Sequence, residues 1–116
     1  MKTISIGRDF SPDPAGRTIE LDGDDSGEAF RERVLVPALK ELGPGEVLEI
    51  VLDDEVISYG SSFLSEGFGG VVREGHMSSE ELLDKVSFSY SRNNKDDFSF
   101  FERKIVEYIK AARKRE

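Results

Sequence analysis

The chain has 116 residues, 34% of them charged, no cysteine and a formal net charge of −8 at neutral pH. This length predicts one domain, residues 1–116, with an ordinary hydrophobic core, and the missing cysteines exclude disulfides and thiolate metal sites. The acidic balance disfavours nucleic-acid binding, because contacts to the phosphate backbone dominate that affinity.

The first third of the chain predicts two strands followed by a helix. Residues 2–6 and 17–21 alternate between polar and apolar side chains, and the loop between them is rich in proline and glycine, so we expect the two strands to form a hairpin. Apolar residues at helical spacing predict a helix that begins at Ser26 and closes at residues 43–45. Pro37 lies inside this helix and is expected to kink it or split it into two pieces.

The remaining elements are predicted in the same way. They are a buried central strand at 47–52, a glycine-containing helix that ends at Gly75, a short capped helix at 79–83, a strand at 86–90 and a final helix at 97–114. The order is β-β-α-β-α-(α)-β-α. We therefore expect an α/β fold in which about four helices pack against a four-stranded mixed sheet.

A turn rich in glycine and serine connects the central strand to the second long helix. Gly60, Ser61 and Ser62 stand where this helix begins, and there the first backbone N–H groups lack partners and the helix dipole favours negative charge. Such a turn suits an anion, a phosphorylated side chain or a partner-facing edge. Two interpretations stay open: one of the two serines is the N-cap of the helix, or a serine is regulated or contacts a partner.

Several short motifs together resemble the bacterial STAS-like domain family of unknown function, over roughly residues 4–90. The motifs are Gly16-Arg17, Ser26-Gly27-Glu28-Ala29-Phe30-Arg31, Asp53 and the run from Tyr59 to Gly69. The resemblance implies the fold of anti-sigma factor antagonists. In those proteins an Asp-Ser-Ser-Gly sequence sits at the same turn, and an anti-sigma kinase phosphorylates a serine there. Ser61 and Ser62 match the two serines, whereas Gly60 replaces the aspartate and Phe63 replaces the glycine.

The resemblance implies a non-catalytic regulatory module that binds a protein partner, by analogy a histidine-kinase-like ATPase of the anti-sigma type. The residues expected at the partner-binding or phosphorylation site are Gly60, Ser61, Ser62, Phe63 and Glu66. Phe63 and Phe68 are expected in the core, and an exposed Phe63 would instead anchor a partner. Glu66 is expected to contact the partner or Arg17.

The alternative function is sensing of a small ligand, a nucleotide or phosphate. Arg17 and Arg31, near the helix start at Ser26 and Gly27, form a candidate anion site. The acidic run 22–28 superficially suggests a calcium loop, but Arg33 stands at position 12, where such a loop needs a bidentate glutamate, so no metal site is expected.

No cofactor and no enzymatic activity are expected. His76 is the only histidine, and the chain offers no identifiable set of nucleophile, base and oxyanion donors. No apolar run approaches the roughly 20 residues that cross a bilayer, and the N-terminus lacks a signal-peptide pattern, so we expect a cytoplasmic protein without membrane contacts. A monomer or a weak homodimer is expected, with Phe100 as the candidate dimer contact. The basic cluster at 110–115 is typical of a solvated helix end, or contacts an acidic partner.

Overall fold

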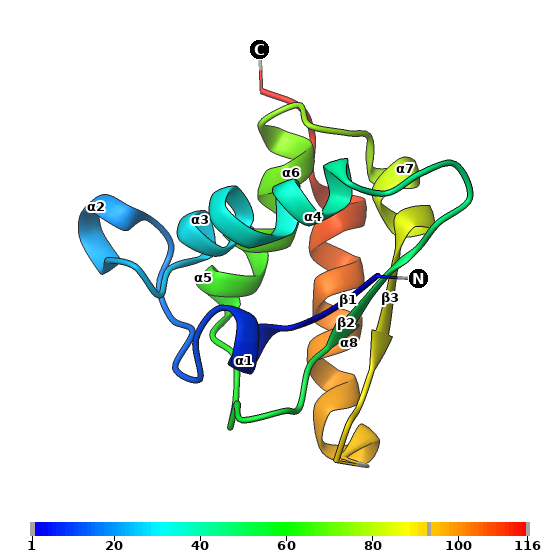
Figure 1. Cartoon of the computed structure of the whole chain (residues 1–116). Helices are drawn as coiled ribbons and strands as arrows, with labels where there is room; N and C mark the ends of the chain where they lie inside the picture. The colour runs from blue at the N-terminus through cyan, green and yellow to red at the C-terminus, as the bar shows by residue number, and fades with distance from the viewer. Residues whose placement is uncertain (1, 93, 116) are drawn as a thin grey trace.

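The computed structural model describes residues 2–92 and 94–115. Within them a parallel sheet of three strands forms the centre of the α/β fold (Figure 1). The strands are β1 (Lys2–Ser5), β2 (Leu48–Val51) and β3 (Val86–Ser89), in the spatial order β1-β2-β3. The predicted four-stranded mixed sheet is therefore wrong in strand number and direction, although three of the four predicted strands form.

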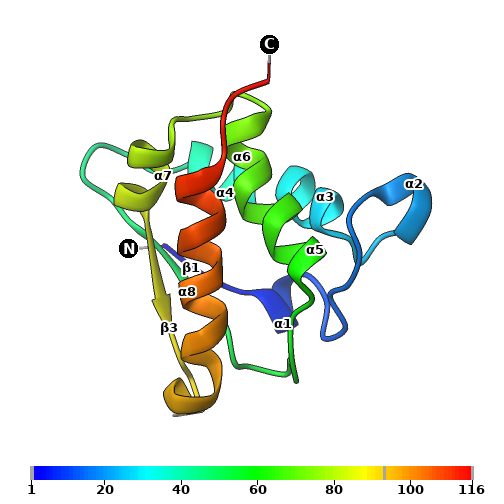
Figure 2. The ribbon, with the colours of Figure 1, turned by 180° about the vertical axis from the view of Figure 1, so that it is seen from behind.

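The segment predicted as the second strand forms a short helix, α2 (Ile19–Asp22). The Thr18 hydroxyl accepts a hydrogen bond from the Leu21 N–H at 3.3 Å, and the Asp22 carboxylate accepts one from the Arg17 N–H at 2.7 Å. These local bonds satisfy the backbone without a sheet partner. The Leu21 side chain is 82% exposed, and α2 projects from the body of the molecule in Figures 1 and 2.

The helices bury one face of the sheet. In β2, Leu48 and Ile50 are fully buried, whereas Glu49 and Val51, which point to the opposite face, are half-exposed. Helix α1 (Ile6–Asp9) follows β1 directly and is capped by the Ser5 hydroxyl. The 17-residue helix α8 (Lys95–Ala111) crosses in front of β1 in Figure 2.

The first long helix contains a wider turn in its middle. It runs as α3 (Gly27–Phe30), the π-helical turn η1 (Arg31–Leu35) and α4 (Val36–Lys40). Pro37 has no N–H and would crowd the carbonyl group four residues earlier in an α-helix. Here Pro37 lies just beyond η1, in the first turn of α4, and the Val36 N–H bonds to the Arg31 carbonyl oxygen instead. The helix is thus divided by a π-helical turn.

The second long helix has the same construction: α5 (Ser61–Leu64), the π-helical turn η2 (Ser65–Gly69) and α6 (Gly70–Arg73). Its glycines allow the close packing that the sequence predicts. A Cβ on Gly67 would lie 3.1 Å from the Phe30 ring, and a Cβ on Gly70 would overlap the Arg31 guanidinium. The two long helices therefore approach each other closely at their π-helical turns.

The C-terminal part agrees with its predicted elements. Helix α7 (Ser79–Lys85) is capped by the Ser78 hydroxyl, which accepts from the Glu81 N–H. In α8, Phe98 and Ile105 are buried and Phe100 is 50% exposed, as their spacing predicts. Asn93, in the polar loop predicted before α8, lies outside the described residues.

Candidate functional site

The serine turn (Gly60, Ser61 and Ser62) lies at the start of α5, and Gly60 is the N-cap residue of this helix. Gly60 is extended, with φ −78° and ψ 150°, and its carbonyl accepts from the Leu64 N–H at 3.2 Å. No side chain caps this helix, so the interpretation that Ser61 or Ser62 is the N-cap is wrong. The two serines are instead the first two helical residues, with Ser61 exposed and Ser62 half-buried.

The loop before this turn contains a buried tyrosine, Tyr59, and an exposed isoleucine, Ile57. The Tyr59 ring is 6% exposed, and its hydroxyl donates to the Leu52 carbonyl oxygen at 2.6 Å. Burial raises the pKa of this hydroxyl, so Tyr59 stays neutral. Two residues earlier, Ile57 is 92% exposed. The loop therefore carries an exposed isoleucine two residues before a tyrosine whose side chain is anchored in the core.

Phe63 lies in the hydrophobic core. It is fully buried, 5.5 Å from Phe30 and 6.0 Å from Tyr59 between ring centroids, and Phe68 is fully buried too. Both residues confirm the prediction of a core position. The anchor role suggested for an exposed Phe63 is therefore not available in this conformation, and Gly60, Ser61 and Ser62 alone present the predicted partner-binding edge to solvent.

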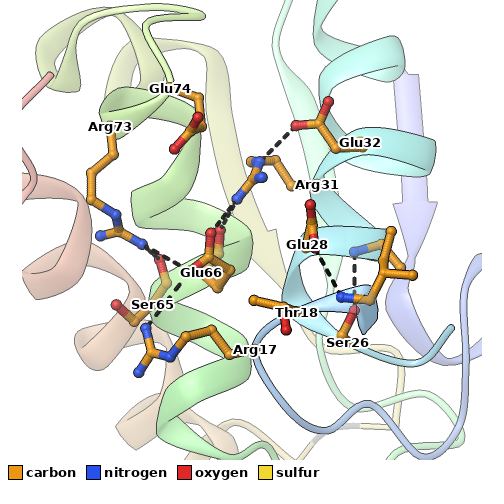
Figure 3. Close-up of polar contacts among 12 residues, drawn as sticks. Arg17, Thr18, Ser26, Glu28, Arg31, Glu32, Ser65, Glu66, Arg73 and Glu74 are labelled. Carbon is orange, nitrogen blue, oxygen red and sulfur yellow. Dashed lines mark hydrogen bonds and ion pairs between the residues drawn. The ribbon is translucent and has the colours of Figure 1, made fainter. Parts of the chain in front are cut away.

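Glu66 is buried as well, and three arginines surround its carboxylate (Figure 3). Arg31 Nη1 donates to Glu66 Oε2 at 2.6 Å and to the Glu66 carbonyl oxygen at 2.9 Å. Nitrogen atoms of Arg17 and Arg73 each lie 3.7 Å from Glu66 Oε1. The expected contact between Glu66 and Arg17 is therefore present, as part of a larger cluster.

Arg31 is also 96% buried and is held by a second carboxylate. Its Nε donates to Glu32 at 2.7 Å. Burial alone would lower the pKa of Arg31, but the hydrogen bonds to Glu32 and Glu66 outweigh it and raise that pKa. Two carboxylates of the chain thus neutralise this buried cation.

Arg17 connects the cluster to the serine turn. Its Nη2 lies 3.4 Å from the Ser62 hydroxyl, and its Nη1 faces Glu66. The backbone of Arg17 is fixed on both sides, because its N–H donates to Asp22 and its carbonyl accepts from the Glu28 N–H at 3.0 Å. The guanidinium thus lies between Ser62 and the buried carboxylate, with half of its side chain exposed.

The four residues of the candidate anion site play different roles. Ser26 is fully buried and caps α3, accepting from the Ala29 N–H at 3.2 Å, as predicted. Gly27 allows close helix packing, since a Cβ there would lie 2.6 Å from the Phe63 carbonyl oxygen. The structure brings Arg17 and Arg31 together, as predicted for an anion site. The anion between them is the carboxylate of Glu66, a residue of the chain itself.

The acidic run 22–28 does not converge on a common point. Asp22 accepts backbone hydrogen bonds and Asp24 pairs with Arg33 at 2.8 Å. Among residues 2–92 and 94–115, no group of three or more histidine or acidic side chains is placed to hold a metal ion. No helix in this part of the chain is long and apolar enough to cross a membrane.

A cluster of charged side chains at the carboxyl end of β2 was not predicted from the sequence. Asp53 is 3% exposed and accepts from the Ser91 N–H at 2.6 Å and the Arg92 N–H at 2.8 Å. Burial alone would raise the pKa of Asp53, but these hydrogen bonds outweigh it and lower that pKa. Asp54 lies between the guanidiniums of Arg8 and Arg92.

A signal for this cluster was present in the sequence. Two aspartates follow a buried strand directly, and the carboxyl ends of parallel strands meet at one edge of a sheet. Because a mixed sheet was expected, the meeting of these strand ends at one edge was not predicted.

Comparison with known families agrees with this architecture. The model of a family described as a STAS-like domain of unknown function (DUF4325) matches residues 26–96, which span α3 to the beginning of α8 and include the serine turn. No curated protein and no solved structure matches the chain. Because the family model covers more than half of the sequence, the chain belongs to the family of STAS-like domains of unknown function.

Proposed function

We propose that this chain is a non-catalytic regulatory module that binds a protein partner through the serine turn, and that phosphorylation of Ser61 or Ser62 switches this binding. The observation that supports it best is the 92% exposure of Ile57, which precedes the exposed Ser61 by four residues in the chain. A large apolar side chain at the centre of a polar rim is typical of a binding hot spot.

The position of the two serines favours a switch that leaves the fold intact. A phosphoserine carries a charge of about −1.5 to −2 at neutral pH, and the first turn of a helix tolerates negative charge. Arg17, 3.4 Å from the Ser62 hydroxyl, offers a phosphate at this position a guanidinium partner. The domain therefore stays folded while the new charge repels an acidic partner surface.

The partner class follows from the resemblance to anti-sigma factor antagonists. It is a histidine-kinase-like ATPase of the anti-sigma type, which both binds the serine turn and transfers phosphate to it. In this phosphorylation the partner is the kinase, and the present chain is its substrate.

The test uses affinity capture followed by binding to the purified partner. Wild type and the Ser61→Asp/Ser62→Asp double variant are used as baits, and captured ATPases are then purified and titrated against each variant. We expect Ile57→Ser to weaken binding at least about tenfold. The control is Leu21→Ser, which removes another highly exposed apolar side chain, 82% exposed, from α2.

The proposal also predicts the chemistry of the switch. With partner and Mg-ATP, mass spectrometry should find phosphate on Ser61 or Ser62, and the Ser61→Ala/Ser62→Ala variant should bind but not be phosphorylated. Equal weakening by Leu21→Ser, or unchanged binding of the Asp double variant, would reject the serine turn as the regulated surface.

The alternative is small-ligand sensing through Arg17, whose side chain is 51% exposed and whose contact to Glu66 is long, at 3.7 Å. A nucleotide or phosphate bound there stabilises the fold by mass action. Thermal unfolding with millimolar GTP, ATP or phosphate tests this function. An unchanged unfolding temperature in all three would exclude it.

A further inference from the structure

A basic hollow of about 570 Å³ lies between the end of α6, the beginning of α7 and the end of α8. These three helix ends lie at the same end of the molecule in Figures 1 and 2. Val72, Met77 and Ala112 contribute an apolar part to its lining, and Ser78 and Ser79 contribute hydroxyl groups. Three cations complete the lining: Lys110, Arg113 and Lys114.

These three cations have no carboxylate partner among the residues that the structure describes. Across residues 2–92 and 94–115, Lys110, Arg113 and Lys114 take part in no ion pair. The Arg113 guanidinium donates to the carbonyl oxygens of Lys110 and Ala112 at 3.0 and 2.9 Å, which fixes its position. A net-negative chain thus concentrates positive charge at one hollow.

The nearby acidic side chains of the described residues face away from these cations. Glu74, at the end of α6, pairs with Arg115 at 3.2 Å. The carboxylates of α7, Glu80, Glu81 and Asp84, line a separate hollow with residues 45–47. Acidic side chains thus line the hollow on one side of Ser78, and basic side chains line the hollow on the other side. The basic hollow is therefore available to an external anion.

The backbone around the hollow is fixed. The Arg115 N–H donates to the Arg73 carbonyl oxygen at 2.8 Å, which ties the end of the described chain to α6. Gly75, with φ +81°, leaves room for the Lys114 side chain, since a Cβ on Gly75 would lie 3.1 Å from Lys114 Cε. Lys114 is therefore held against the α6–α7 loop.

We infer that this hollow binds the phosphate monoester of a small, partly apolar molecule. Two lysines and one arginine neutralise a dianion, the two serine hydroxyls donate hydrogen bonds, and the apolar part of the lining contacts the organic group. Because the whole chain carries −8, its long-range field repels anions, and affinity must come from these local groups. None of the lining residues belongs to the serine turn, so this site is separate from the proposed function.

The experiment is a titration of the isotopically labelled full chain with AMP at pH 7.5, followed by NMR, with adenosine and sulfate as comparison ligands. We expect saturable shifts of amide signals in residues 75–79 and 110–115 for AMP, and none for adenosine. The Lys110→Gln/Lys114→Gln variant should bind AMP at least tenfold more weakly. Arg103→Gln/Lys104→Gln removes the same charge from α8 outside the hollow and should bind like wild type.

A second variant tests the same site by a substitution that is expected to leave the fold intact. Ser79→Asp places a carboxylate in the lining, at a position that is already polar and partly exposed, and should abolish the shifts. An equal loss in the Arg103/Lys104 control would mean general charge attraction and would overturn the inference. So would AMP shifts confined to residues outside the hollow, or adenosine or sulfate binding as tightly as AMP.

Discussion

The Arg31 guanidinium and the Glu66 carboxylate meet at 2.6 Å between two π-helical turns, and both residues are more than nine-tenths buried. Each comes from a different long helix, so the pair joins the two helices through the interior. Two further cations, Arg17 and Arg73, lie 3.7 Å from the same carboxylate, so positive charge exceeds negative charge in this cluster.

Glu66→Ala should destabilise the fold by about 3–5 kcal/mol, because it leaves the buried Arg31 with only its partly exposed partner, Glu32. Urea unfolding at pH 7 measures the change in the free energy of unfolding. The matched control is Glu32→Ala, which removes the other carboxylate on Arg31 and should cost about 1 kcal/mol or less. Equal losses in the two variants would show that the Arg31–Glu66 pair has no special role in stability.

Asp53→Asn should lower stability at neutral pH by about 1–3 kcal/mol, because the N–H groups of Ser91 and Arg92 donate to different carboxylate oxygens and an amide has only one acceptor oxygen. The pKa of Asp53 in the folded state lies below its ordinary value of 3.8. The stabilisation is therefore fully present above the unfolded-state pKa and is lost as pH falls through the folded-state pKa. The gap in unfolding free energy between wild type and variant should close below pH 4.

The comparison for this pH series is Asp22→Asn. Asp22 also accepts from two backbone N–H groups, of Arg17 and Thr18, but on the exposed surface, so its loss should cost less. A gap for Asp53→Asn that is independent of pH would contradict the charge-based explanation.

Gly7→Ala should prevent normal docking of α1. A Cβ on Gly7 would overlap the backbone carbonyl oxygen of Asp54 and lie 3.0 Å from Val56 Cγ2, and neither the loop backbone nor a buried valine moves at low cost. We expect a loss of about 3 kcal/mol or more. Gly43→Ala is the control, because its Cβ meets only the flexible Glu46 side chain, at 3.3 Å. Circular dichroism during thermal unfolding distinguishes the two, and a similar unfolding temperature would refute the proposed clash.

Gly60→Asp should raise the stability by about 0.5 kcal/mol. Gly60 is the N-cap of α5, has no side chain to accept from the first N–H groups, and has open space where a Cβ would lie. An aspartate supplies both the acceptor and a charge that suits the dipole. Urea unfolding beside Gly60→Ala, which adds a side chain without an acceptor, separates capping from the general effect of losing a glycine. No gain over Gly60→Ala would count against Gly60 as an unfilled cap.

Periodicity predicted most of the fold, because Leu48 and Ile50 alternate as strand residues do and Phe98 and Ile105 recur at helical spacing. It failed at residues 17–21, where five alternating residues fit a strand, but Thr18 and Asp22 satisfy the backbone locally. The N-cap of α5 was missed because a glycine without a side-chain acceptor occupies it beside two serines that are good caps.

The candidate site was predictable only in part. Its glycines indicated close helix packing, and of the two contacts expected for Glu66, a partner or Arg17, the structure contains the one with Arg17. The Arg31–Glu66 pair joins residues 35 positions apart, and no local pattern encodes such a contact. The same holds for Asp53 and Ser91, whose meeting depends on the parallel order of the strands.

The two π-helical turns make the long helices sensitive to insertion and deletion. A π-helical turn contains one residue more than an α-helical turn. Deleting one residue from 31–35 would restore α-helical bonding but rotate α4 by about 100°, which would turn Leu39, now 3% exposed, away from the core. A deletion in η2 would move Glu66 or Phe68 in the same way. We therefore expect related chains to vary in length at the exposed turn 22–25 and to keep the number of residues between Ser26 and Lys40 and between Gly60 and Arg73.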